Sequence, residues 1–174
     1  KNLISEEGNE LPGFDALMKE HVPARIFAPG TTPAYSNYGA SLAGYIVQRV
    51  SGMSFDDYVE KHIFAPLGMN STTFRQPLPA DWKPRMATGY KDASHPPRKF
   101  ELVGAAPAGS VSTTASDMAR FMIAHLQQGK YGEAQILRPE TVQLMHGTPL
   151  TILPRVNRMV LGFYESNYKG RRMI

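Results

Sequence analysis

One unbroken stretch leads from an extended segment into a helix and decides how the chain folds around it: Pro29-Gly30-Thr31-Thr32-Pro33-Ala34-Tyr35-Ser36-Asn37-Tyr38. The prolines and the glycine predict an extended loop up to Ala34. Tyr35 and Asn37 then lie two residues apart on a turn, where both side chains can point into one cleft. A phenol can take and return a proton, and a carboxamide donates and accepts hydrogen bonds at once. The pair therefore predicts a chemical site, and the alternative is that Tyr35 packs and Asn37 caps the helix.

The helix that follows has a clear apolar pattern. Leu42, Ile46 and Val50 repeat at i, i+4 and i+8, which predicts one apolar face. Gly52 is a natural residue to end this helix. Small residues on another part of the same helix predict close packing against a neighbour: Gly39, Ala40, Ala43 and Gly44.

Other segments predict further helices and little sheet. We expect a helix that ends near Glu20, a second that begins after a Ser54 cap, a third between about 114 and 129 and a fourth that begins at Pro139. In the third, a buried stripe is predicted at Met118, Phe121, Met122, His125 and Leu126. Strands are predicted at 86–90, 99–103, 160–165 and 171–174. The fold class predicted from these patterns is α+β, mainly α.

Composition limits the classes of function. The 174 residues are 42% hydrophobic, which is ordinary for a globular protein, and no apolar run is long enough to cross a membrane. The absence of cysteine excludes disulfides and thiol catalysis. The net charge of +4 is scattered over the second half without a dense basic run, so no nucleic-acid partner is expected, although the charge favours anionic substrates mildly. The five histidines have no paired spacing that would predict a metal site.

Several ordered blocks resemble one known family, the serine β-lactamase and penicillin-binding-protein superfamily. The likeness is to its class C branch, which includes D-Ala-D-Ala carboxypeptidases and esterases, and it covers most of residues 25–174. The blocks are Phe27–Gly30, Tyr35–Gly39, Gly44–Val47, Val50–Gly52, Ile63–Thr72, Ala108–Phe121 and Leu161–Phe163.

In that family a Ser-x-x-Lys, a Tyr-x-Asn and a Lys-Thr-Gly or His-x-Gly strand meet in one cleft. The resemblance implies that Tyr35 is catalytic, carrying the proton of the nucleophilic serine, and that Asn37 binds substrate. It also implies the helical portion of a β-lactamase/transpeptidase-like fold, no cofactor and no metal. The substrate would be a small-molecule or peptide acyl compound, namely a β-lactam, a D-amino peptide or an ester. A periplasmic or secreted location is favoured by the same resemblance.

The first and third elements of the family pattern lack convincing matches. Ser166-Asn167-Tyr168-Lys169 has the Ser-x-x-Lys letters, but it falls in a predicted strand and turn after the Tyr-x-Asn. His146-Gly147-Thr148 closes a predicted helix. We therefore expect residues 1–174 to be the central part of one β-lactamase-like domain, with the Ser-x-x-Lys region and the third strand outside this chain. Such a piece would be inactive alone and would expose apolar surface that allows self-association.

Two other functions remain open at this point. One is a non-catalytic relative of the family that only binds its ligand. The other is a helical interaction module with a complete core of its own. Reading the encoded sequence on either side for the two other motifs would discriminate among these alternatives.

Overall fold

The computed structural model describes residues 4–6, 11–147 and 159–174. The chain forms two compact units, and each is described by itself. Unit 1 consists of Lys1–Pro23, Ser36–Lys61 and Ser71–Thr114. Unit 2 consists of Ala24–Tyr35, His62–Asn70 and Ala115–Ile174. Both units are assembled from several stretches of sequence, so their cores depend on contacts between distant segments.

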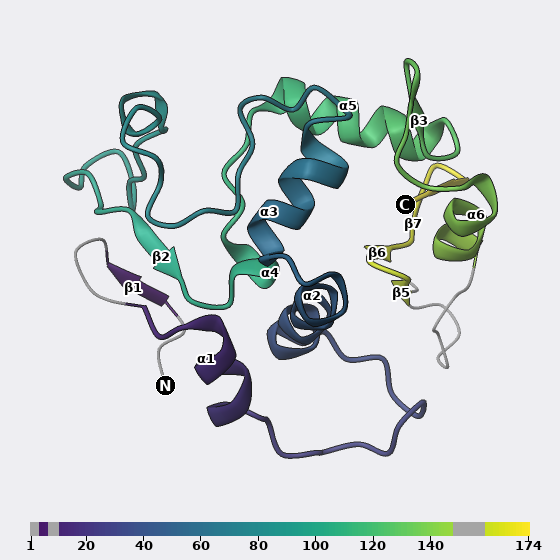
Figure 1. Ribbon diagram of the computed structural model, residues 1–174, viewed down its shortest axis with the longest axis horizontal. Helices are drawn as coiled ribbons and strands as arrows, with labels where there is room; N and C mark the ends of the chain where they lie inside the picture. Colours follow the sequence, from purple (N-terminus) through teal and green to yellow (C-terminus); the bar gives the residue numbers. More distant parts are fainter. Residues whose placement is uncertain (1–3, 7–10, 148–158) are drawn as a thin grey trace. The chain divides into compact units, whose positions relative to one another are not determined.

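Unit 1 is built around its longest helix, α2. This helix contacts α1, α3 and α4 (Figure 1). The small sheet of unit 1 pairs β1 with β2 in antiparallel register, with Ser5 opposite Leu102. The elements are β1 (Ile4–Glu6), α1 (Phe14–Glu20), α2 (Asn37–Ser51), α3 (Phe55–Val59), η2 (Lys83–Arg85), β2 (Glu101–Val103) and α4 (Ala106–Gly109).

The small residues predicted to allow close packing do so at one position of α2. A Cβ atom on Gly44 would lie 2.4 Å from Cγ of Pro107 and 3.1 Å from Cδ2 of Phe55, so only glycine fits there. The predicted end of the helix is also confirmed, because Gly52 takes a left-handed φ of 70° at the C-cap. Next to this contact lies the core of Leu17, Met18 and Ala105.

The apolar face predicted for α2 is present but is not buried. Leu42, Ile46 and Val50 are 37%, 53% and 83% exposed. The buried side of the helix carries Ser41 and Gly44 instead. The tight contact at Gly44 turns the small residues toward α4, which leaves the larger apolar side chains outside the core of unit 1.

A network of charges ties the segment after residue 70 to α3 and to Glu60, the residue that caps its C-terminal end. The guanidinium of Arg75 donates from Nε to Oε1 of Glu60 at 2.9 Å and from Nη2 to Oε2 at 2.7 Å. The same Nη2 also donates to Asp57, and this contact holds the pKa of the Asp57 carboxyl below its usual range. Thr73 and Ser112 exchange two backbone hydrogen bonds of 2.9 Å, which brings the two ends of residues 73–112 together.

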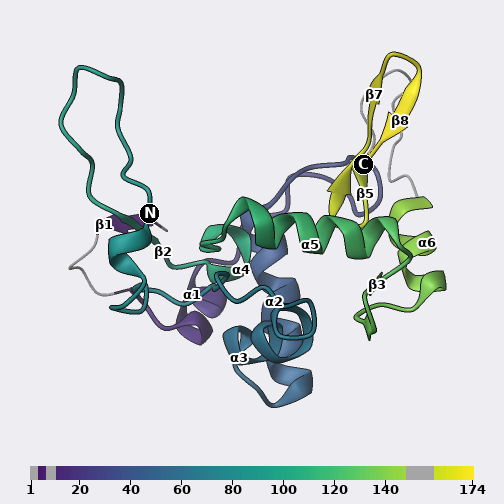
Figure 2. The same cartoon turned by 90° about the horizontal axis from the view of Figure 1, so that it is seen from above.

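Between these ends the chain makes a long excursion, residues 74–111, which includes β2 (Figure 2). The strand predicted at 99–103 is found in part, as β2. The strand predicted at 86–90 is wrong, since only Tyr90 forms a bridge there, with Pro97. Prolines and glycine interrupt the ladder on both arms of the excursion.

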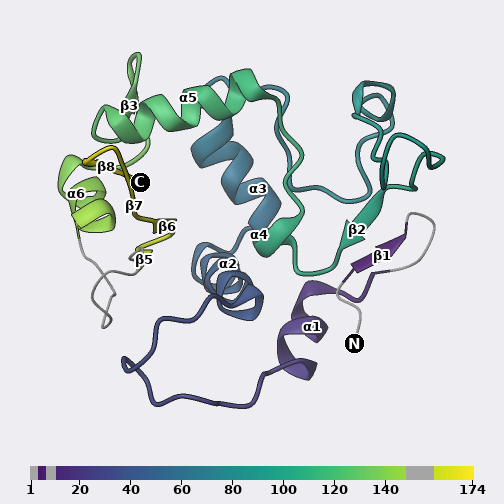
Figure 3. The ribbon, with the colours of Figure 1, turned by 180° about the vertical axis from the view of Figure 1, so that it is seen from behind.

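In its described residues, unit 2 combines two α-helices with three short hairpins (Figure 3). Helices α5 and α6 begin where the sequence predicts, at Ala115 and Pro139. The stripe predicted on α5 is only partly buried, because His125 is enclosed whereas Met122 and Leu126 are 58% and 78% exposed. The elements are α5 (Ala115–Leu126), β3 (Lys130–Tyr131), β4 (Ala134–Gln135), α6 (Pro139–Gly147), β5 (Met159–Val160), β6 (Phe163–Tyr164), β7 (Ser166–Tyr168) and β8 (Arg171–Met173).

The last part of the chain differs from its prediction in two respects, the first being that β8 pairs with β7 (Ser166–Tyr168), which overlaps the turn predicted from Asn167 on. Second, the single strand predicted at 160–165 is two strands, β5 and β6, paired as a hairpin. Gly162 causes the break, because its φ of 87° suits a tight turn and not a strand. The backbone N–H of Leu161 instead donates to the carbonyl of Met145 at 3.1 Å, which joins the hairpin to α6.

The fold class predicted from the sequence is confirmed. Helices supply most of the regular structure, and each sheet in the described residues has two strands. A π-helical turn, η1 (Glu60–Phe64), continues α3. Among the described residues, no helix combines the length and the apolar character that crossing a bilayer requires.

Candidate functional site

Tyr35 lies at the end of the extended segment of unit 2. Residues 28–31 form a tight turn, in which the hydroxyl of Thr31 donates to the carbonyl of Ala28 at 2.7 Å. Gly30 has a φ of 76° in this turn, which is why a glycine stands there. The chain then extends to Tyr35, which is 62% exposed. The phenol is therefore presented outward and is not held as a packing residue of a core.

Asn37 is the first residue of α2, in unit 1, and its side chain is exposed. The N-cap of this helix is Ser36, whose hydroxyl accepts a hydrogen bond from the backbone N–H of Gly39 at 3.0 Å. The alternative in which Asn37 caps the helix is therefore wrong. Because the serine does the capping, the carboxamide of Asn37 is not needed for helix initiation.

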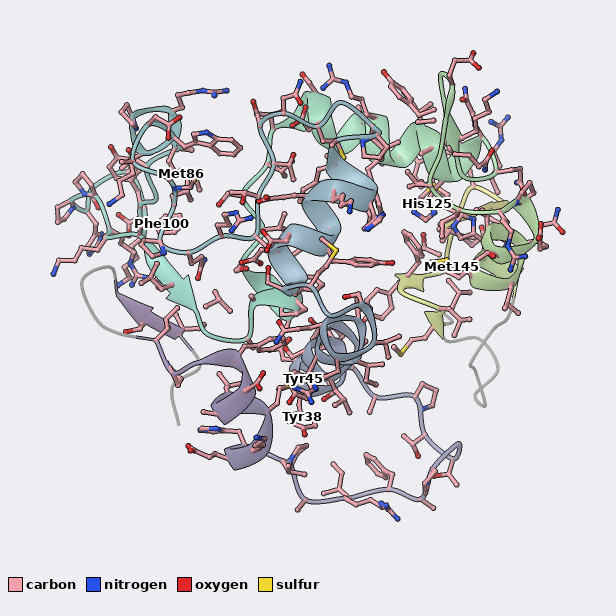
Figure 4. The ribbon with its side chains drawn as sticks, in the orientation of Figure 1. Tyr38, Tyr45, Met86, Phe100, His125 and Met145 are labelled. Atoms are coloured by element: carbon pink, nitrogen blue, oxygen red, sulfur yellow. The ribbon has the colours of Figure 1, made fainter. Side chains whose placement is uncertain are left out.

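The start of α2 is fixed in unit 1 by side chains that follow Asn37. The hydroxyl of Tyr38 donates to the carbonyl of Met18 at 3.1 Å, and the ring of Tyr45 meets Phe14 edge to face at 5.8 Å (Figure 4). Gln48 donates to the carboxylate of Asp15 at 3.3 Å. A helix held at three positions along its length places its first residue more accurately than a loop does.

Ser166 and Lys169 do not form the nucleophile motif of the family. Ser166 begins strand β7, and Lys169 lies in the turn with a φ of 50°. The expectation of a strand and turn in this place is confirmed. The turn is held by Asn167, whose side-chain oxygen accepts from the N–H of Gly170 at 2.9 Å. A serine in this setting lacks the helical spacing that would place the lysine beside its hydroxyl.

Two histidines that look solitary in the sequence lie in contact in unit 2. Nδ1 of His125 and Nε2 of His146 are 3.2 Å apart, and both rings pack on Phe163 at about 5 Å (Figure 4 labels His125). Burial lowers the pKa of both imidazoles below the ordinary value. The charge of His146 lowers the pKa of His125 further, and the charge of Arg172 lowers the pKa of His146 further. Their separation of 21 positions in the chain hides this pair from any local pattern. One histidine lies on α5 and the other on α6, so only the fold brings them together.

The described residues hold no group of three or more histidine, cysteine, aspartate or glutamate side chains that could ligate a metal ion. The His125–His146 pair supplies two nitrogens only. Neither Tyr35 nor Asn37 has metal-binding chemistry around it within the residues described. The chemistry available at these two positions is proton transfer by the phenol and hydrogen bonding by the carboxamide.

Comparison with known proteins gives a consistent result. The family model described as Beta-lactamase matches residues 14–174. A penicillin-binding protein of Bacillus subtilis (strain 168) is 29% identical over 168 residues, covering 84% of this chain and 37% of that protein. The D-amino acid amidase of Ochrobactrum anthropi SV3, solved with L-phenylalanine amide, is 27% identical with a TM-score of 0.64, covering 82% and 41%. A class C β-lactamase of Rhodobacter sphaeroides is 25% identical with a TM-score of 0.66, covering 92% and 44%.

These matches are partial on the side of the relatives. The chain spans about a third of the length of the curated relatives that it matches, 32% and 37% in two of them. The likeness includes the Tyr35–Asn37 stretch, since the family match begins at residue 14 and continues to 174.

Proposed function

Because this chain belongs to the β-lactamase family, we propose that the protein carrying it is a serine hydrolase that works through an acyl-enzyme. The observation that carries the proposal is the arrangement of Tyr35-Ser36-Asn37 at the start of α2. Ser36 satisfies the helix N-terminus, α2 is anchored on α1, and the side chains on either side of the cap stay exposed. Because only Ser36 is used to cap the helix, the side chains of Tyr35 and Asn37 remain available for chemistry.

In the proposed reaction, Tyr35 acts as the proton carrier. The phenolate oxygen takes the proton from a serine hydroxyl, whose oxygen then attacks the acyl carbon of the substrate. As the bond to the leaving group breaks, the phenol returns that proton to the leaving atom. Water repeats the sequence on the acyl-enzyme and releases the acid. A cationic lysine near the phenolate stabilises its negative charge and makes the first step easier.

Asn37 has the second role, which is to bind the substrate. Its NH₂ group donates a hydrogen bond to the substrate carbonyl while its oxygen accepts from the lysine of the nucleophile motif. The serine and the lysine are proposed to lie in parts of the protein outside this chain, because Ser166 and Lys169 occupy a strand and a turn.

The substrate class is an acyl compound with an amide, lactam or ester bond. The names of the relatives support the lactam and amide parts of this range, since they include a β-lactamase, a penicillin-binding protein and a D-amino acid amidase. All three groups of substrate share one requirement, which is a carbonyl that accepts a hydrogen bond while a proton is delivered to the leaving atom.

A labelling experiment tests the proposal. The full-length protein is treated with a fluorophosphonate or a labelled penicillin, and intact mass with peptide mapping identifies the modified serine. We expect one adduct, on a serine outside these 174 residues, and no adduct on the 174-residue chain alone. A full-length protein that binds the penicillin without a covalent adduct would be the non-catalytic relative. An adduct on Ser166 that disappears in Ser166→Ala would overturn the placement of the nucleophile.

Asn37→Ala in the full-length protein is expected to lower kcat/KM by about tenfold or more, the scale of one hydrogen bond to a charged or developing charge. The melting temperature should hardly change, because Ser36 and not Asn37 caps α2. Ser36→Ala is the matched comparison, and it should lose about 1 kcal/mol of stability. A variant of Asn37 that loses stability with unchanged kinetics would return this residue to a purely structural role.

A further inference from the structure

Unit 1 contains a pocket that the proposed reaction does not use. Its volume is about 600 Å³, which is within the range of small-molecule sites. The walls come from the two arms of the excursion, residues 83–90 and 98–103, and residues 109–112 complete them. Figure 4 labels one residue on each arm, Met86 and Phe100.

Backbone and side-chain hydrogen bonds define the shape of this pocket. Between the arms, the N–H of Arg98 donates to the carbonyl of Gly89 at 2.8 Å. Gln76 accepts from the N–H of Val103 through its side-chain oxygen. At the third wall, the hydroxyl of Ser110 donates to the carbonyl of Phe74 at 2.9 Å. Because hydrogen bonds within unit 1 hold each wall, the pocket is part of the folded structure of that unit.

The lining of the pocket combines apolar side chains with positively charged ones. Met86 and Phe100 supply apolar surface, together with aliphatic side chains of neighbouring segments. Three cations line the same space, Lys83, Arg98 and Lys99, against a single carboxylate, Glu101. The sequence places these cations among scattered surface charges, whereas the fold collects them from two separated segments.

We propose that this pocket binds a small organic anion with one carboxylate and an aromatic or branched aliphatic body. The apolar wall favours transfer of the body from water. The guanidinium of Arg98 suits the carboxylate, because its planar fork can donate two parallel hydrogen bonds. A cleft whose lining is mainly of one sign of charge also concentrates ligands of the opposite sign. The inference stands on unit 1 alone and does not depend on the chemistry proposed for Tyr35.

The test uses the full-length protein with ¹³C-labelled methionine methyl groups and 4-phenylbutyrate as the probe. We expect a saturable shift of the Met86 methyl signal, while the signal of Met145, in unit 2, stays in place. The uncharged analogue 4-phenyl-1-butanol should bind about tenfold more weakly or worse, since it loses a charge-assisted hydrogen bond. Its body is the same, so the difference measures the anion.

Two variants complete the design. Arg98→Gln should weaken 4-phenylbutyrate about tenfold. Arg49→Gln removes an equal charge from the exposed face of α2, outside the pocket lining, and should leave binding unchanged. The proposal is overturned if Met86 shows no saturable shift, if the alcohol binds as well as the acid, or if both arginine variants weaken binding equally. Because none of these readouts involves turnover, they are independent of the proposed hydrolase activity.

Discussion

Tyr35→Phe in the full-length protein should lower kcat by about a hundredfold or more, the scale of a lost general acid–base group. The substitution keeps the ring and removes only the hydroxyl that would carry the proton. Since the residue is 62% exposed, the melting temperature should stay within about a degree or two of the parent protein. Turnover is measured with a panel of a chromogenic cephalosporin, a D-amino acid anilide and an activated ester.

Tyr38→Phe is the matched control for this result. Its hydroxyl donates to the carbonyl of Met18 in a partly buried position, so its removal should cost about 1 kcal/mol of stability. Its turnover should fall far less than that of Tyr35→Phe, because it removes an anchor of α2 and not the proposed proton carrier. The proposed role of Tyr35 fails if Tyr35→Phe keeps its kcat on every substrate that the parent protein hydrolyses.

Gly129→Ala should cause a large loss of stability, about 3 kcal/mol or more, from two combined effects. The residue has a φ of 87°, which is unfavourable for any residue with a Cβ. The added Cβ would also lie 2.1 Å from the carbonyl oxygen of Leu137, which is backbone and cannot rotate away. Gly129 closes α5 through its N–H bond to Ala124 at 2.8 Å, so the strain acts directly on that helix end.

Gly132→Ala separates the two effects. This residue also has a positive φ, 56°, but a Cβ there would have nothing within 4 Å. It should lose only about 1 kcal/mol, the cost of the backbone conformation alone. Urea denaturation of both variants, with fitted m-values, gives the comparison. Equal losses would mean that the approach of Leu137 to Gly129 is not a real constraint.

The sequence predicts the elements of this chain better than it predicts their burial. The C-terminal end of α2 and the start of α6 follow from local rules for Gly52 and Pro139, and both are confirmed. The orientation of α2 is different, because Gly44 decides it through one close contact with Pro107, which is distant in the chain. Periodicity shows that a helix has an apolar face, but only tertiary contacts determine whether that face is covered.

The candidate site shows the same division. Tyr35 and Asn37 could be selected from the sequence because both belong to one short motif. Whether Asn37 or Ser36 caps the helix depends on backbone geometry that the letters do not reveal. Lys83 and Arg98 come from two separate arms and line one pocket only because of the path of the chain between them, so no local pattern could have found them.

The histidine pair of unit 2 limits the stability of the protein at low pH. Neutral imidazoles can share one hydrogen bond across the 3.2 Å between His125 and His146, whereas two imidazolium rings repel each other beside Arg172. Since folding lowers both pKa values, their contribution to stability is complete above the ordinary histidine pKa and is lost as the pH falls through the lowered values. Mild acid should therefore part α6 from α5 while the arginine–carboxylate network of Arg75 in unit 1 still holds, so the two units would lose their structure at different acidities.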